Sequence, residues 1–264
     1  FALEKAVNDP NSGAEDIAKV MSHDPSLTMR VLRLANSAYY TGAGGPITSV
    51  KMAVTRLGFV EIRKLATTVA VIKIFDRVAP SFDHKKFWQH SLTAAISTKV
   101  IRGFCGEGIR FNDEEAFVAG LLHDIGVLLL DQYFHERLLE VNARAREEEL
   151  TTAEAELAVL GMDHGEVGGC LLDHWKIPKP IVEAVTWHHQ PGRAAPEFST
   201  LVNAVHLADF TCTYLGVGDG GDGWTKGFAD GIWHDLQLDI GDIPAITQEV
   251  EEEAGRCQGL LALM

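Results

Sequence analysis

The sequence lacks the usual features of secreted and membrane-spanning proteins. Its four cysteines, Cys105, Cys170, Cys212 and Cys257, are widely separated and include no Cys-x-x-Cys pair. Neither a disulfide framework nor a thiolate zinc site is therefore indicated. No uninterrupted apolar run approaches the roughly 20 residues that a membrane-spanning helix needs. These absences predict a soluble protein of the reducing cytoplasm that has no membrane partner.

Positive charge is also scarce in this chain. It carries 37 acidic and 23 basic residues, which gives a formal net charge of −14. Because such a surface repels phosphate backbones, we expect no direct binding to nucleic acid. With 264 residues and 46% hydrophobic content, the chain is long enough to form one sizeable core or two small domains.

Strand-like alternation and internal repeats are absent as well, whereas apolar residues recur at helical intervals along most of the chain. Leu27, Val31 and Leu34, for example, fall on one face of a helix. Ser49 is a candidate N-terminal cap of the next helix, and Gly58 is its candidate stop. The sequence therefore predicts an all-α fold.

Two segments interrupt the helical pattern. The stretch "VAPSFD", residues 78–83, is the best internal boundary. The stretch "VGDGGDGWTKG", residues 217–227, is rich in glycine but lacks the flanking strand and the Lys-Ser/Thr ending of a phosphate-binding loop. We interpret it as a linker, and we expect an acidic amphipathic helix from about Ile243 onwards.

The apolar stretch "AFVAGLLHDIGVLLLDQYF", residues 116–134, is predicted to form one helix and carries His123 and Asp124 near its middle. Burying an imidazole and a carboxylate among leucines is unfavourable unless each group finds a partner. Neighbours on a helix point about 100° apart, so their head groups cannot easily bond to each other. Both side chains therefore need partners from elsewhere, either other side chains or a bound cation.

More groups of the same kind recur in other predicted helices: His90, His164, His188, His189 and Asp209. Imidazole nitrogens and carboxylate oxygens are ligands of zinc, iron and manganese. A carboxylate can also bridge two cations about 3.5–4 Å apart. Each residue alone has an ordinary alternative. His90 lies on an apolar face and suits a core residue, His188 and His189 suit a helix C-terminal cap, and Asp209 could bond to His206.

The order of these groups along the chain resembles a known superfamily. The motif "GLLHDIG", with His90 upstream and Asp209 downstream, resembles the HD superfamily of metal-dependent phosphohydrolases over roughly residues 85–210. The segment "DPSLTMRVLRLANSAYYTGAGGPITSVKMAVTRLGFVEIRKL" is similar to the opening of the HDOD domain, the HD-related output domain of bacterial signalling proteins. The segment "LGMDHGEVGGCLLDHWKIPKPIVEAVTWHHQP" is similar to the later signature of that family. Together the likeness reaches to about residue 215.

The resemblance implies an organisation and a role. It implies a helical N-terminal lobe, residues 1–80, packed on an HD-like metal-binding helical core, residues 81–215. The glycine-rich loop and the C-terminal helical tail, residues 216–264, follow. The implied role is that of a cytoplasmic output or scaffolding module in bacterial signal transduction, which acts on protein partners. The oligomeric state is not implied.

The resemblance also implies a set of metal ligands. The first metal site of HD hydrolases corresponds by position to His90, His123, Asp124 and Asp209. The second site of the binuclear subgroup corresponds to His164, His188 and His189, with Asp124 as the bridge. We therefore expect one or two divalent ions, with iron and zinc as the best candidates. The alternative is a metal-free site in which these groups bond to each other and to water.

Two departures bear on catalysis. Relatives of the HD-GYP group, which cleave cyclic di-GMP, carry a lysine directly after "HDIG", where this chain has Val127. Valine cannot donate a hydrogen bond to a phosphate oxygen or neutralise developing charge. Their Gly-Tyr-Pro motif is replaced here by "QPGR", residues 190–193. We therefore predict a module without catalytic turnover. The alternatives are a metal-dependent phosphohydrolase or phosphodiesterase acting on nucleotides or cyclic dinucleotides and, third, a di-iron oxygenase.

Overall fold

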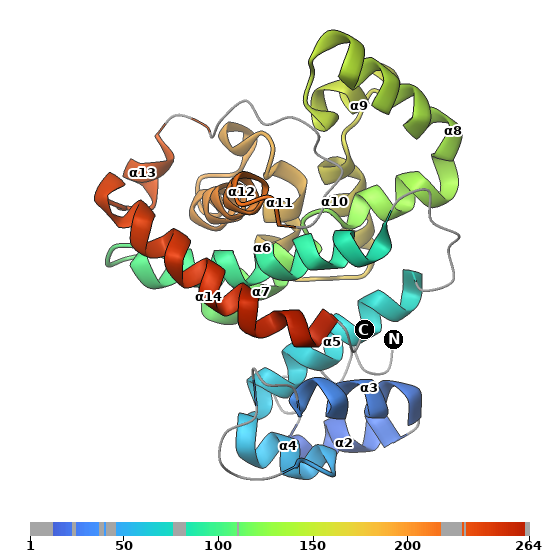
Figure 1. The fold of residues 1–264 in the computed structure, drawn as a ribbon, viewed down its shortest axis with the longest axis vertical. Helices are drawn as coiled ribbons and strands as arrows, with labels where there is room; N and C mark the ends of the chain where they lie inside the picture. The colour runs from blue at the N-terminus through green and yellow to red at the C-terminus, as the bar shows by residue number, and fades with distance from the viewer. Residues whose placement is uncertain are drawn as a thin grey trace. The chain divides into compact units, whose positions relative to one another are not determined.

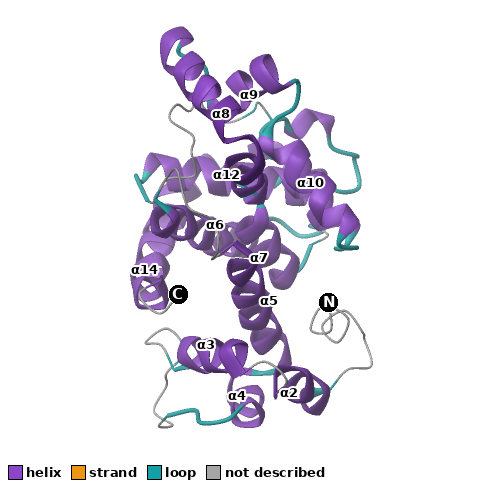
Figure 2. Ribbon diagram, turned by 90° about the vertical axis from the view of Figure 1, so that its right-hand side faces the viewer, coloured by secondary structure: helices purple, strands orange, loops and turns teal. Residues whose placement is uncertain are grey.

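The structure is a computed structural model, and it describes residues 13–22, 25–36, 40, 46–75, 83–109, 111–217, 229 and 231–261. These residues form helices joined by loops and contain no strand (Figures 1 and 2). The prediction of an all-α fold is confirmed for this part of the chain. Most of the stretch "VAPSFD" and of the glycine-rich segment lies outside the described residues.

The chain divides into two compact units, of which the first comprises Phe1–Val78 and Gly255–Met264. Its N-terminal part contains the helices α2 (Ala14–Ser22), α3 (Pro25–Ala35), α4 (Val50–Leu57) and α5 (Phe59–Phe75). Helices α3 and α4 pack against α5, and α2 packs against α3 and α4. Buried side chains from these helices, including Met21, Val31, Leu34, Ala53 and Ile62, form the core of this part.

Helix α4 has both of the ends that the sequence predicts. The Ser49 hydroxyl accepts a hydrogen bond of 3.2 Å from the backbone N–H of Met52, which caps the helix. Gly58 ends it with a φ of 88°, a conformation that costs glycine nothing but strains other residues. Both predicted ends are therefore confirmed.

The second unit, Ala79–Ala254, contains most of the helices. They are α6 (His84–Phe104), α7 (Asp113–Leu122), α8 (Ile125–Glu148), α9 (Thr152–Leu160), α10 (His164–His174), α11 (Lys179–Trp187), α12 (Ser199–Tyr214), α13 (Ile232–Asp235) and α14 (Ile243–Leu261, which ends beyond this unit). Two short 3₁₀ helices, Pro191–Arg193 and Ile240–Asp242, separate some of these. Helix α6 packs against α7 and α12, helix α11 against α7, α10 and α12, and helix α10 against α8.

The expectation of a single helix over residues 116–134 is wrong. Helix α7 ends at Leu122 and α8 begins at Ile125, so His123 and Asp124 lie at the junction of two helices. Asp124 has φ −96° and ψ 10°, outside helical geometry. Helix α8 then continues to Glu148 with a kink at Phe134, where the backbone has φ −133° and ψ 32°. The apolar run gives no sign of the junction, because both helices are buried there.

Helices α7 and α8 also include the one stretch of the described residues that is long and apolar enough to cross a membrane, Asp113–Glu148. In this protein 78% of the most apolar part of this stretch is buried in the interior. A helix that is apolar on all sides and enclosed by protein is typical of the core of a soluble domain. The burial of this stretch is consistent with the predicted soluble protein.

A capping box stabilises the start of α7. The side chain of Asn112 accepts hydrogen bonds from the backbone N–H groups of Glu114 and Glu115, and the Glu115 carboxylate accepts one from the backbone N–H of Asn112. We expect Asn112→Ala to lower the free energy of unfolding by about 1 kcal/mol, because these N–H groups lose their acceptor. Urea denaturation measures the change. Asn112→Asp, which keeps the acceptor, serves as the control, and equal losses in both variants would contradict the capping role.

Candidate metal centre

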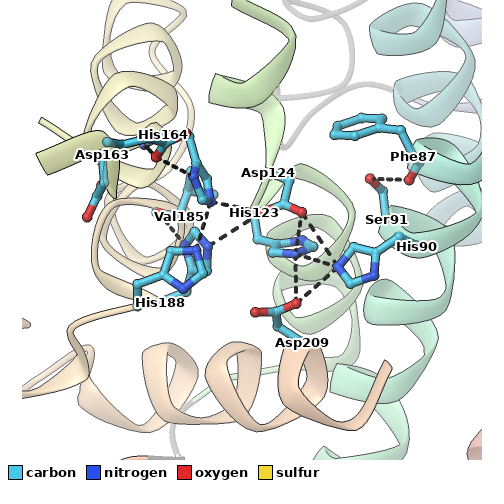
Figure 3. A network of polar contacts seen from close by, with 12 residues as sticks. Phe87, His90, Ser91, His123, Asp124, Asp163, His164, Val185, His188 and Asp209 are labelled. Atoms are coloured by element: carbon cyan, nitrogen blue, oxygen red, sulfur yellow. Dashed lines mark hydrogen bonds and ion pairs between the residues drawn. The ribbon is translucent and has the colours of Figure 1, made fainter. Parts of the chain in front are cut away.

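All seven side chains that were singled out from the sequence converge in one region of the second unit, and Figure 3 labels each of them except His189. They come from six helices or from residues next to helix ends. His90 lies within α6 and Asp209 within α12. The others lie at helix ends: His123 after α7, Asp124 before α8, His164 at the first position of α10, and His188 and His189 after α11.

One group of side chains surrounds one oxygen of Asp124. The Oδ2 atom of Asp124 lies 3.1 Å from the Nε2 atom of His123 and 3.5 Å from that of His90. On the other side of the same two imidazoles, Asp209 Oδ1 lies 3.0 Å from His90 Nε2 and 3.6 Å from His123 Nε2. We call these four residues the first centre. The close approach of His123 to Asp124 was not expected, and it is possible because the chain leaves helical geometry at Asp124.

A second group surrounds the other oxygen of Asp124. The Oδ1 atom lies 3.2 Å from His164 Nε2 and 3.6 Å from His188 Nε2. His189 completes this group, with its Nε2 atom 2.7 Å from that of His164. We call these four residues the second centre. Figure 3 shows the Asp124 carboxylate between His164 and His188 on one side and His90 on the other, so this carboxylate is shared by both centres.

His123 and His188 bond to the backbone through Nδ1 and direct Nε2 into the centres. The Nδ1 atom of His123 lies 2.8 Å from the Gly120 carbonyl oxygen, and that of His188 lies 2.7 Å from the Val185 carbonyl oxygen. A carbonyl oxygen only accepts hydrogen bonds, so Nδ1 carries the hydrogen in both rings. In the neutral ring Nε2 is then a lone-pair donor to a metal, the arrangement found in metal-ligating histidines.

The donor set fits divalent cations. Both carboxylate oxygens of Asp124 and the Nε2 atom of His188 are buried without a hydrogen-bond partner among the described residues. Asp124 takes the N-cap position of α8, yet its side chain does not cap the helix. Buried polar atoms that lack a partner are rare and unfavourable. Because imidazole nitrogens and carboxylate oxygens face one another here, a cation at each centre would satisfy both kinds of atom.

The charges of the buried groups also favour bound cations at the two centres. Burial disfavours the charged form of Asp124, yet the neighbouring imidazoles, His123 foremost, hold its pKa well below the usual value. Burial also disfavours a charged His123, but the carboxylates of Asp124 and Asp209 raise its pKa to about 10. The buried carboxylates of Asp124 and Asp209 are therefore stabilised by positive charge on the groups around them. Divalent cations would supply that charge in place of protons.

Several residues near the second centre were not singled out from the sequence. Glu156, on α9, is completely buried and contacts His164. The amide of Gln190 donates to the carboxylate of Asp163, and the guanidinium of Arg193 bonds to Gln190 while it covers the ring of Trp187. Their position in the sequence could have indicated them, since most of these residues adjoin His164, His188 or His189.

Asp209 does not bond to His206, the alternative partner that its position in the sequence allowed. The structure places its carboxylate against His90 and His123 rather than against His206. The ring of His206 contacts backbone groups instead, the carbonyl of His188 and the N–H of Ala229. His188 is indeed the C-terminal cap residue of α11, but its ring also faces Asp124.

Comparison with known proteins identifies the family. The family model described as "HDOD domain" matches residues 1–191. The chain belongs to the HDOD family. The match includes the N-terminal helices and both centres except Asp209, so the resemblance of the sequence is confirmed.

Solved structures share the fold of this HDOD protein. An HDOD domain protein of unknown function from Geobacter sulfurreducens is 27% identical with a TM-score of 0.76, and the match covers 95% of this chain and 90% of that one. A provisionally assigned phosphohydrolase from Shewanella amazonensis SB2B is 25% identical with a TM-score of 0.79, over 99% and 91% of the two chains. A provisionally assigned signal transduction protein from Marinobacter aquaeolei VT8, 24% identical with a TM-score of 0.80 over 99% and 56% of the two chains, shares the fold.

A curated relative is longer than this HDOD chain. It is an uncharacterised protein of Treponema pallidum (strain Nichols), 22% identical over 213 residues. The match covers 81% of this chain but only 40% of the relative's length.

Proposed function

We propose that this HDOD domain binds two divalent cations and acts as a cytoplasmic output module of bacterial signal transduction, without catalytic turnover. The observation that carries the proposal is the Asp124 carboxylate, whose two buried oxygens face two separate groups of imidazoles. A buried carboxylate shared in this way is the arrangement that holds two neighbouring cations. We propose zinc or iron as the cations, because both accept imidazole and carboxylate ligands.

The number of protein ligands supports a non-catalytic role. In the second centre the ligand atoms of four protein groups lie within 4.8 Å of one another, and four protein ligands fill the tetrahedral coordination of a structural zinc site. A catalytic zinc site keeps an open position for water or substrate. Six of the seven groups are buried, and only His189 is partly exposed. Val127, one turn after Asp124, is buried and provides no donor for a phosphate. These features favour a closed centre.

The acidic character of the chain supports protein partners rather than nucleic acid. With a net charge of −14, the surface attracts basic protein segments and repels phosphate backbones. We propose that the partners are proteins of a signalling pathway.

A metal-dependent phosphohydrolase is the second candidate. The shared carboxylate favours it, because binuclear hydrolases also hold two cations close together, and these cations supply Lewis acidity toward a phosphoryl group. The provisional assignment of the protein from Shewanella amazonensis SB2B is in line with this candidate. The residues of this chain would then hold the cations, and His189 would mark the accessible side.

Elemental analysis combined with activity assays tests the proposal. The purified protein is loaded with zinc or with ferrous iron, freed of excess metal, and assayed against bis(4-nitrophenyl) phosphate, linear nucleotides and cyclic dinucleotides. Two bound cations without turnover support the output module. Turnover that disappears in His123→Ala establishes the phosphohydrolase instead. A protein that retains no cation has a metal-free site and refutes both candidates.

Removal of the cations is expected to lower the thermal stability. A ligand that binds only the folded state stabilises it by about 2.7 kcal/mol at a free concentration 100 times its Kd. For a domain of this size, we therefore expect Tm to fall by roughly 5–10 °C when a chelator removes the metal. Differential scanning calorimetry measures the shift. Calcium, which prefers oxygen ligands, is the control and should not restore Tm. An unchanged Tm after chelation would refute the metal site.

A further inference from the structure

Glu156 is a buried carboxylate with an unusual set of contacts. It lies in α9 and is fully buried, which is rare for a glutamate unless it is paired. Its Oε2 atom accepts a hydrogen bond of 2.7 Å from the backbone N–H of His164 and also lies 2.7 Å from the Nδ1 atom of that residue. The same oxygen therefore contacts both the backbone and the ring of one residue.

This contact distinguishes His164 from the other candidate ligands with a described Nδ1 partner, His123 and His188. His123 and His188 donate from Nδ1 to uncharged carbonyl oxygens, whereas the partner of His164 is a carboxylate. A carboxylate acceptor fixes the orientation of a ligating imidazole and makes its other nitrogen a stronger donor to a metal. Glu156 thus acts on Nε2 of His164, the atom that faces Asp124.

Glu156 also fixes the start of α10. His164 is the first residue of this helix, and its N–H group has no acceptor within the helix. The carboxylate supplies that acceptor and places negative charge at the helix N-terminus, where it is favourable. One side chain therefore holds both the backbone position and the ring of His164.

Helix α9 provides no ligand of its own, yet Glu156 connects it to the second centre. The helix packs against the C-terminal half of α8, as Figure 1 shows, and also touches α10. Leu138, Val141 and Ala145 of α8 form a small core with Ala155 of α9. Glu156 comes directly after Ala155, so the pairing of α8 with α9 sets the position of its carboxylate.

We propose that Glu156 is a positioning residue that sets the cation affinity of the second centre and couples that cation to α9. This inference rests on the proposed binding of two cations. Loss of the carboxylate weakens the second centre selectively, since Glu156 contacts His164 and none of the ligands His90, His123 and Asp209 of the first centre. Occupancy of the second centre in turn holds α9 against α10.

The test uses variants in which one centre remains. His90→Ala leaves the second centre intact, and His189→Ala leaves the first. Glu156→Gln is introduced into each, and the metal-free proteins are titrated with Co²⁺ while the visible absorption reports the coordination. We expect the Kd of the second centre to rise about 10-fold with Glu156→Gln and up to about 100-fold with Glu156→Ala. The Kd of the first centre stays unchanged. Glu147→Gln, which alters an exposed carboxylate of α8, is the matched control.

Amide hydrogen exchange gives a second readout that a general loss of stability would not imitate. In the wild-type protein, loading with Co²⁺ is expected to slow exchange in α9, and in Glu156→Gln this extra protection is lost. Circular dichroism of the metal-free proteins checks the fold. Should Glu156→Ala not fold, the result for Glu156→Gln alone is the test. The inference is overturned, while two-cation binding stands, if Glu156→Gln binds Co²⁺ at the second centre as tightly as before. It is also overturned if Co²⁺ protects α9 equally in the wild-type protein and in Glu156→Gln. A wild-type protein that binds no Co²⁺ overturns both.

Discussion

Asp124→Asn is expected to abolish tight binding at both centres, so that the number of bound cations falls from two to none. The carboxylate of Asp124 contributes Oδ2 to the first centre and Oδ1 to the second. An asparagine amide is neutral and has a single oxygen, so it cannot bridge two cations. Loss of an outer-shell partner alone weakens metal binding 10–100-fold, and we expect loss of this shared ligand to exceed about 100-fold at each centre. Elemental analysis after dialysis measures the stoichiometry.

Single-centre variants make the result specific. Asp209→Asn removes a carboxylate that contacts His90 and His123 of the first centre and should leave one cation, and His189→Ala should leave the other. Asp131→Asn is the matched control, because Asp131 is a buried carboxylate of α8, the helix that follows Asp124, and contacts His135 outside both centres. If Asp124→Asn still binds one cation tightly, Asp124 belongs to one centre and does not bridge the two.

Much of the fold and the identity of the converging residues could be predicted because they depend on residue type and spacing. Apolar residues at helical intervals predict the helices, and Ser49 and Gly58 predict the ends of α4. Adjacent His123 and Asp124 in an apolar run predict partners from elsewhere, because burying such groups alone is too costly. The same residue types in other predicted helices supplied the other candidates, the resemblance assigned them to two metal sites, and the structure brings all of them together.

The junction between α7 and α8 could not be predicted from local pattern. The residues on both sides of it are apolar because both helices lie in the core, so the run looks like one helix. The role of Glu156 could not be predicted either. It depends on the turn between α9 and α10, which brings a carboxylate back onto a residue eight positions later. Both features are properties of packing between helices rather than of periodicity within one helix.

Gly126→Ala is expected to destabilise the domain and to disrupt the second centre. Helices α8 and α10 approach so closely at Gly126 that a Cβ atom there would lie 1.9 Å from the carbonyl oxygen of His164 and 2.8 Å from the backbone nitrogen of Gly168. Both are backbone atoms, so no side-chain rotation relieves the clash and the helices must separate. Overpacking of a core usually costs 1–3 kcal/mol, and we expect at least about 3 kcal/mol here because backbone must move.

The position of the clash determines at which centre cation binding is weakened. The atom that a Cβ at Gly126 would strike belongs to His164, a ligand candidate of the second centre, and the separation of α8 from α10 carries His164 away from Asp124. Urea denaturation of the metal-free protein measures the loss of stability, and a Co²⁺ titration should show the second centre weakened more than the first. Gly103→Ala is the control, since Gly103 lies in α6 with open space around its Cβ position, and alanine there should stabilise the helix by up to about 1 kcal/mol. If Gly126→Ala matches Gly103→Ala in stability, the two helices do not need the close approach that brings Asp124 against His164.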